Sequence, residues 1–174
     1  MTAFFLPNIR AIQCSKIYMR DEDLTVLVPD VPPPFTSPIT TLHMTSSGMP
    51  LKTFTKFLRL PKALVEFSYR GSTHIGMNGY TMNDMGLVLS RYHYKSLEIL
   101  TLEGTETIEA RAQPGLPYEG DYAAPERIGS LTHFEKLRVI EVPLWTLVSY
   151  SYQRYDITGL LPKSLEIIKL SLDE

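Results

Sequence analysis

Cysteine is almost absent from this sequence. The single residue, Cys14, cannot form a disulfide within the chain. Glycosylation sequons of the form Asn-x-Ser/Thr are also missing, because Asn8, Asn78 and Asn83 each lack the Ser or Thr two positions later. A secreted, disulfide-stabilised domain is therefore disfavoured, and we expect an intracellular protein of the cytoplasm or nucleus.

The chain has no long hydrophobic run and no large excess of one charge. The apolar stretch at residues 2–6 is interrupted by Pro7 and has no basic residue before it, so it predicts neither a signal peptide nor a membrane span. The 17 Lys and Arg residues and 19 Asp and Glu residues give a formal net charge of −2. Because no polybasic stretch stands out, we predict no nucleic-acid binding and no membrane binding.

Signature motifs of common enzyme classes are missing as well. There is no Walker loop, no G-x-G-x-x-G, no G-x-S-x-G and no H-E-x-x-H. His43, Glu66 and Glu141 are residue types used in acid–base catalysis and metal binding, but they come from three separate segments without ligand spacing. We predict that the protein is not an enzyme and has no catalytic residues, cofactor or metal; an enzyme with an unrecognised site is the alternative.

What the sequence does contain is a repeated pattern of apolar residues, L-x-x-L-x-L. Its copies Leu97–Leu102 and Leu165–Leu170 are nearly identical. Leucine-rich-repeat units are about 20–29 residues long, and the copies here start 25 to 40 residues apart, so the longer gaps require inserts. Six segments fit the pattern: Ile9–Cys14, Ile39–Met44, Leu64–Tyr69, Leu97–Leu102, Leu137–Val142 and Leu165–Leu170.

The alternating part of each copy predicts a short strand with one buried face. Stacked copies would form a parallel sheet, whose strands need crossover connections on the outer side. Helical spacing of apolar residues predicts helices at 52–60, before Pro61, and at 81–94. Shorter helices or single turns are expected at 130–134 and 159–162. Cys14 falls on an inward strand position and should be a small buried hydrophobe.

Several short motifs resemble the repeat region of fungal F-box-type leucine-rich-repeat proteins. They are Leu-Pro-Asn-Ile-Arg at 6–10, Tyr-Lys-Ser-Leu-Glu-Ile-Leu at 94–100 and Leu-Pro-Lys-Ser-Leu-Glu at 161–166. The resemblance implies an α/β fold, an irregular leucine-rich-repeat solenoid arc. About six parallel strands would line its concave face, and helices or turns its convex face. In that family an amino-terminal F-box docks on a ubiquitin-ligase scaffold and the repeats hold the substrate. No segment here looks like an F-box, so a scaffold is expected only if one lies outside this chain.

The domain organisation follows from the repeats. We expect a single leucine-rich-repeat domain over residues 1–174, with an acidic, Gly- and Pro-rich flexible insert at 103–127 and an extended connector at 20–38. The aromatic segment 145–155 either covers the edge of the core or forms a contact patch. Because no polar capping unit is visible at either end, we expect a fragment of a longer array, or an end covered by a partner or a second copy.

The leading functional hypothesis is a protein–protein interaction module, and its narrower form is the substrate-recognition half of a ubiquitin-ligase adaptor. Solenoids commonly bind partners on the side chains that point outward from their strands. An ordinary solvated face is the competing interpretation, and a degenerate repeat protein without a present partner is a further alternative. The predicted contact residues are Gln13, Thr41, His43, Glu66, Ser68, Arg70, Thr101, Glu103, Glu141 and Lys169.

Overall fold

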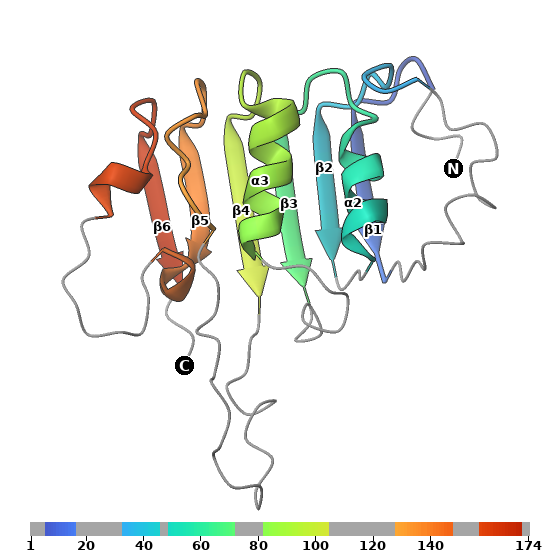
Figure 1. Cartoon of the computed structure of the whole chain (residues 1–174). Helices are drawn as coiled ribbons and strands as arrows, with labels where there is room; N and C mark the ends of the chain where they lie inside the picture. Colours follow the sequence, from blue (N-terminus) through green and yellow to red (C-terminus); the bar gives the residue numbers. More distant parts are fainter. Residues whose placement is uncertain are drawn as a thin grey trace, which may run out of the picture.

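The computed structural model describes residues 6–16, 33–45, 49–71, 82–104, 128–147 and 157–171. Within these ranges the chain forms a six-stranded sheet whose strands follow one another in chain order (Figure 1). All neighbouring strands pair in parallel. The strands are β1 (Ala11–Ser15), β2 (Thr41–Thr45), β3 (Glu66–Gly71), β4 (Ile99–Gly104), β5 (Val139–Pro143) and β6 (Ile167–Ser171).

The six parallel strands confirm the α/β prediction and the placement of all six strands on the repeated motif. Equivalent positions of the repeats lie directly side by side. The inward residues Leu42, Phe67 and Leu100, for example, are in register across β2, β3 and β4. Each copy of the motif therefore contributes one strand, and matching positions of neighbouring copies pair in register.

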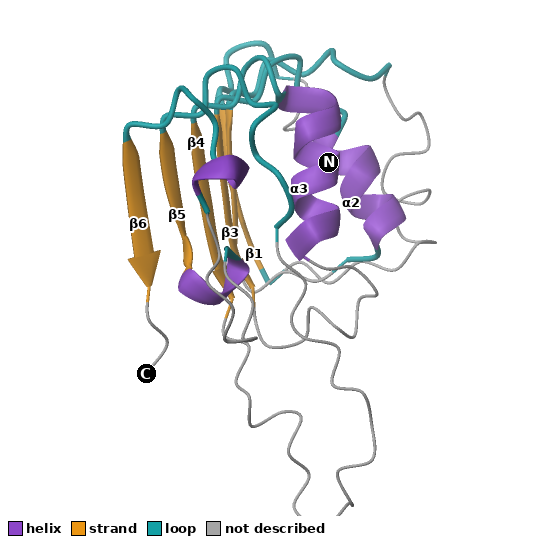
Figure 2. Cartoon of the chain, turned by 60° about the vertical axis from the view of Figure 1, so that its left-hand side comes forward, coloured by secondary structure: helices purple, strands orange, loops and turns teal. Residues whose placement is uncertain are grey.

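Helices cover one face of the sheet (Figure 2). They are α2 (Leu51–Leu58) and α3 (Met82–His93), with single 3-10 turns η4 (Leu144–Thr146) and η5 (Thr158–Leu160) in the later crossovers. The two α-helices match the predicted helices at 52–60 and 81–94 to within two residues at either end. At 130–134 the chain makes a turn rather than a helix.

The core lies between the sheet and these helices. Helix α2 buries Phe54, Phe57 and Leu58, which recur at helical spacing on one side of the helix. The ring of Phe54 meets that of Phe67 on β3 edge-to-face, with centroids 6.0 Å apart. Such pairs add specific geometry to a contact already driven by apolar burial. Inward residues of β2 to β5 are almost completely buried, and outward residues of the same strands are half-buried or exposed.

One boundary differs from that predicted. Glu103 belongs to β4, which continues to Gly104, so it does not open an insert; the remainder of the predicted insert, 105–127, lies outside the described residues. Alternation along β5 would turn Pro143 to the outward face, but Pro143 is buried, because η4 begins immediately after it. Of the aromatic segment 145–155, the structure describes only the backbone through η4 and the buried Thr146 and Leu147.

The connector predicted at 20–38 is described only from residue 33. There it makes a turn and then a single parallel bridge between Ser37 and Pro61. Helices long and apolar enough to cross a bilayer are not found in the described part of the chain.

Candidate binding surface

The outward strand residues form a face on the side of the sheet opposite α2 and α3, and no helix of the described residues covers it; we call it the helix-free face. Strand register places its residues in rows, because parallel strands repeat about every 4.8 Å. All ten predicted contact residues lie on this face and are half-buried or exposed. The middle row runs from β1 to β6 through six of them: Gln13, His43, Ser68, Thr101, Glu141 and Lys169.

The remaining four predicted residues flank this row on β2, β3 and β4. Thr41 lies beside Glu66, and Arg70 lies beside Glu103. The structure therefore brings together the residues that the sequence pattern selected. They come from six segments between residues 13 and 169, and only the sheet makes them neighbours.

Ion pairs join adjacent strands across the face. His43 Nε2 lies 2.9 Å from Glu66 Oε1, linking β2 to β3. Arg70 and Glu103 link β3 to β4 at 3.1 Å. Lys169 Nζ and Glu141 Oε2 link β6 to β5 at 3.2 Å. We call the pairs of this face the ion-pair ladder; each is partly exposed and so contributes little to stability by itself.

One row of the ladder was missed by sequence reasoning. Glu98, Arg138 and Glu166 directly precede β4, β5 and β6, where strict alternation would turn them inward. Arg138 instead reaches both neighbours, with Nη2 3.0 Å from Glu98 and Nη1 3.5 Å from Glu166. The hydrogen bond that Arg138 donates to Glu98 and the charges of both carboxylates raise the pKa of Arg138. A signal was available: the same repeat position carries Glu, Arg and Glu in three successive copies.

An apolar row lies between the two charged rows at the β6 end of the face. Ile99, Val139 and Ile167 are in direct register on β4, β5 and β6. Ile99 and Val139 are half-buried, and Ile167 is 48% exposed. Their outward position follows from alternation, but they were not among the predicted contact residues. Apolar side chains bordered by polar ones are the usual composition of a protein–protein contact patch.

The charges of the face are unequal in number. Five carboxylates, Glu66, Glu98, Glu103, Glu141 and Glu166, stand against four permanent cations, Arg10, Arg70, Arg138 and Lys169. His43 adds a further cation only when protonated. The face therefore carries a small excess of negative charge at neutral pH.

The possible acid–base trio is only partly assembled. His43 contacts Glu66, whereas Glu141 lies on β5, with β4 between it and the strand of Glu66. Among the described residues there is no cluster of three or more His, Cys, Asp or Glu that could hold a metal ion. The geometry of this trio thus offers a hydrogen-bonded pair and no convergent site.

Cys14 and His93 lie in the core behind the face. Cys14 is 8% exposed, as predicted for a small buried hydrophobe, and burial raises the pKa of its thiol. His93, at the end of α3, is 1% exposed. Its Nε2 lies 2.6 Å from the Leu58 carbonyl oxygen and its Nδ1 accepts from the Leu64 N–H at 3.4 Å. Burial lowers the pKa of His93, against the opposing effect of the Leu58 hydrogen bond.

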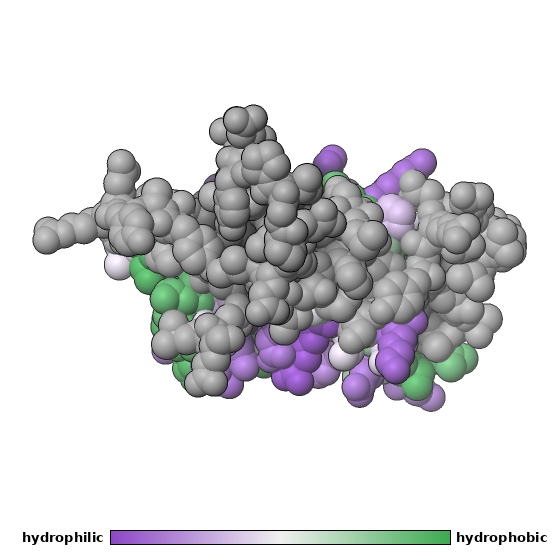
Figure 3. Space-filling model, turned by 90° about the horizontal axis from the view of Figure 1, so that it is seen from below, coloured by the Kyte–Doolittle hydropathy of each residue, from purple (hydrophilic) through white to green (hydrophobic). Residues whose placement is uncertain are grey.

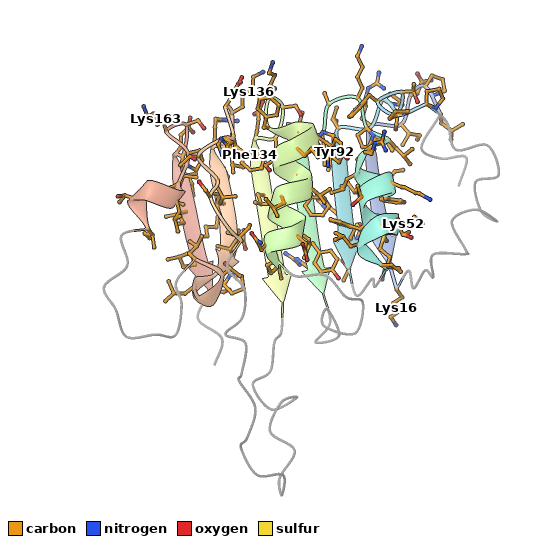
Figure 4. All side chains as sticks on the ribbon, in the orientation of Figure 1. Lys16, Lys52, Tyr92, Phe134, Lys136 and Lys163 are labelled. Carbon is orange, nitrogen blue, oxygen red and sulfur yellow. The ribbon has the colours of Figure 1, made fainter. Side chains whose placement is uncertain are left out.

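Exposed lysines line the edge of the sheet where the strands begin. Lys62, Lys95 and Lys163 each stand two positions before the first apolar residue of a repeat, and Lys136 stands one position before it. Figure 4 shows Lys136 and Lys163 at the upper edge, above the start of β5 and β6. This row is separate from the helix-free face and provides a second charged surface.

No protein-family model, no curated protein and no solved structure matches this chain.

Proposed function

We propose that this chain is a protein-interaction module that binds its partner on the helix-free face. The observation that carries the proposal is the in-register apolar row of Ile99, Val139 and Ile167, set between two rows of the ion-pair ladder. An apolar centre with a charged border provides both contact area and selectivity. The small excess of negative charge on the face is compatible with a partner segment whose apolar side chains are flanked by Arg or Lys.

The architecture that we propose for the module is a leucine-rich-repeat arc. It is supported by six parallel strands in chain order, each on one copy of L-x-x-L-x-L, with helices in the crossovers on one face. In such an arrangement the strand face is the common binding surface, because each repeat adds one strand to it. The single buried cysteine, Cys14, supports a location in the cytoplasm or nucleus.

A narrower role is the substrate-recognition half of an F-box-type ubiquitin-ligase adaptor. The repeat motifs that resemble that family support it, and the role requires an F-box joined to these repeats. Co-purification of the product of the complete gene with a ubiquitin-ligase scaffold tests this narrower role. Absence of the scaffold would remove the adaptor role and leave the interaction module in place.

The contact face is tested by exchanging the charges within pairs. The quadruple variant Arg70→Glu, Glu103→Arg, Glu141→Lys and Lys169→Glu keeps two ion pairs and the net charge while it reverses the pattern presented to a partner. A partner is first identified with the wild-type chain as bait, and its Kd is then measured with purified proteins. We expect the exchanged variant to bind at least about tenfold more weakly, the effect of about 1.4 kcal/mol, with an unchanged Tm.

A matched control reverses charges elsewhere. The double variant Lys95→Glu and Lys136→Glu alters the edge where strands begin and leaves the helix-free face intact. It should retain wild-type affinity. If the exchanged variant binds as tightly as wild type, or if the lysine variant is the one that loses binding, the helix-free face is not the contact surface.

A further inference from the structure

Strand β6 closes the sheet at one end, and all five of its residues are exposed. Ile168 and Leu170 take the inward positions of their repeat, yet they are 38% and 41% exposed. Their neighbours in register on β5, Ile140 and Val142, are 0% and 1% exposed. Seen from below, one group of hydrophobic residues lies towards the left end of the molecule, which is the β6 end in Figure 1, and another lies towards the right end (Figure 3). The inward side of this last strand therefore lacks the cover that every strand from β2 to β5 has.

The unpaired backbone groups of β6 belong to these same two residues. The Ile167 N–H donates to the Arg138 carbonyl at 2.9 Å, and Ile167 is in register with Val139. In a parallel pair, the N–H and C=O groups of every second residue bond to the neighbouring strand, and those of the residues between them point to the other side. Ile167, Lys169 and Ser171 consequently bond to β5, whereas the N–H and C=O groups of Ile168 and Leu170 point to the open edge. Exposed apolar side chains and available hydrogen-bonding groups thus coincide.

The β6 edge also lacks the features that usually prevent edge-to-edge pairing. It contains no proline, no glycine and no bulge, and its one charged residue is Lys169. Lys169 points to the helix-free face and contacts Glu141 rather than projecting from the edge. At the opposite end, the inward residues of β1 are better covered, with Ile12 half-buried and Cys14 buried.

We propose that β6 of a second copy of this chain covers this edge, forming an antiparallel pair about a two-fold axis at Lys169. In this register Ile168 lies opposite the partner's Leu170, and Leu170 lies opposite the partner's Ile168. Each of these pairs exchanges two N–H···O bonds, so every edge-facing group of both residues is satisfied. The four apolar side chains meet on the inward side, and the two Lys169 side chains lie on the helix-free face, each beside its own Glu141.

Self-pairing suits this edge better than pairing with β1 of another copy. A two-fold contact uses the same strand on both subunits and closes after two copies, whereas a β6-to-β1 contact would continue into an open chain. A two-fold contact also places apolar edge residues opposite apolar edge residues: on β6, Ile168 and Leu170 are 38% and 41% exposed, whereas on β1, Ile12 is half-buried and Cys14 is buried. The proposal does not depend on the proposed function, because β6 can pair whether or not the helix-free face binds a partner.

Disulfide trapping tests the register. Residues 169 of the two copies form the non-hydrogen-bonded pair at the axis, where Cα atoms are about 4.5 Å apart, within the range that a disulfide spans. Lys169→Cys should therefore form a cross-linked dimer under mild oxidation. Ser171→Cys is the matched control, because its two copies would lie four residues out of register, about 13 Å along the strands, and should remain uncross-linked. Wild-type protein, which retains the buried Cys14, sets the background.

Sedimentation velocity over a wide range of protein concentration tests the association itself. The wild-type mass should rise from 19.8 kDa towards twice that value. Leu170→Lys places a charge among the paired apolar side chains and should keep the protein monomeric with an unchanged circular dichroism spectrum, whereas Ser171→Lys should still dimerise. A wild-type chain that stays monomeric at all concentrations overturns the proposal. A dimer that survives Leu170→Lys, or in which Lys169→Cys does not cross-link, overturns it equally.

Discussion

At the scale of single residues, His93 shows how a polar group becomes part of the core. It lies at the end of α3 and connects that helix to the end of α2 through Leu58 and to the start of the third repeat through Leu64. The two contacts require a neutral ring, in which Nε2–H donates and Nδ1 accepts. Burial lowers the pKa of His93 from its ordinary value of 6.5, which favours the same neutral form.

This geometry predicts a pH-dependent stability. Below the ordinary value of 6.5 the unfolded chain binds a proton at His93 that the folded chain does not bind. Stability contributed by this group is therefore complete above pH 6.5 and falls as the pH is lowered towards the folded pKa. His93→Leu should lower the free energy of unfolding at pH 7.5 by about 1–3 kcal/mol, because it leaves a buried carbonyl and a buried N–H without partners.

Urea unfolding at a series of pH values checks this expectation. The difference between wild type and His93→Leu should shrink as the pH falls below 6.5, since the variant no longer has the titrating group. His133→Gln is the control, because His133 is exposed and its loss leaves both buried hydrogen bonds intact. A difference that is constant with pH would contradict the neutral, buried state of His93.

At the scale of elements, α3 is held against the chain that leads into the fifth repeat. Gly86 lies inside this helix, and a Cβ placed on it would stand 2.5 Å from the Ile128 carbonyl oxygen and 3.0 Å from Ile128 Cγ1. Ile128 is itself 2% exposed. The glycine therefore permits a close approach between helix and backbone that no other residue type allows at this distance.

Replacing this glycine should reverse the usual effect of alanine in a helix. Alanine normally stabilises a helix interior by about 1 kcal/mol relative to glycine, but Gly86→Ala must displace the backbone at Ile128. We expect a net loss of about 1–3 kcal/mol, the cost typical of overpacking, measured by thermal or urea unfolding. Gly159→Ala is the matched control, because nothing lies within 4 Å of its added Cβ. Equal free energies of unfolding for the two variants would show that the backbone at Ile128 moves to accommodate the added Cβ at little cost.

At the scale of the whole molecule, the sheet is a stack whose two ends differ from its middle. Leu100, Ile140 and Ile168 occupy the same repeat position on β4, β5 and β6. The first two are 0% exposed and the third is 38% exposed. Chemically similar residues thus experience different environments solely because of their place in the stack.

Truncation to alanine at this repeat position should therefore lower the free energy of unfolding by different amounts on different strands. Leu100→Ala creates a cavity in the core and should destabilise the chain by about 2–5 kcal/mol. Ile168→Ala removes a side chain that is already partly in water and should cost about 1 kcal/mol. Both are measured by urea unfolding at low protein concentration, where contacts between copies do not contribute. Equal losses would mean that β6 is as well packed as the centre of the sheet.

The sequence alone was sufficient to place the six strands and their inward and outward residues. Each strand depends on a local alternation, and the spacing from Leu97 to Leu102 or from Leu165 to Leu170 defines that alternation without reference to other segments. The two α-helices were predicted for the same reason. Alternation alone does not account for the burial of Pro143, which depends on the 3-10 turn that follows, and that turn is set by packing rather than by periodicity.

Only the tertiary structure decided which side chains meet across the sheet. Arg138 pairs with Glu98 and Glu166, which are 40 and 28 residues away in the chain, and no local pattern encodes those distances. The role of His93 between two helical ends and the exposure of Ile168 and Leu170 likewise follow from stacking order. A repeat dictates the shape of its own strand, whereas its neighbours determine how much of that strand is covered, because burial in a parallel sheet is supplied by the strands and helices on either side.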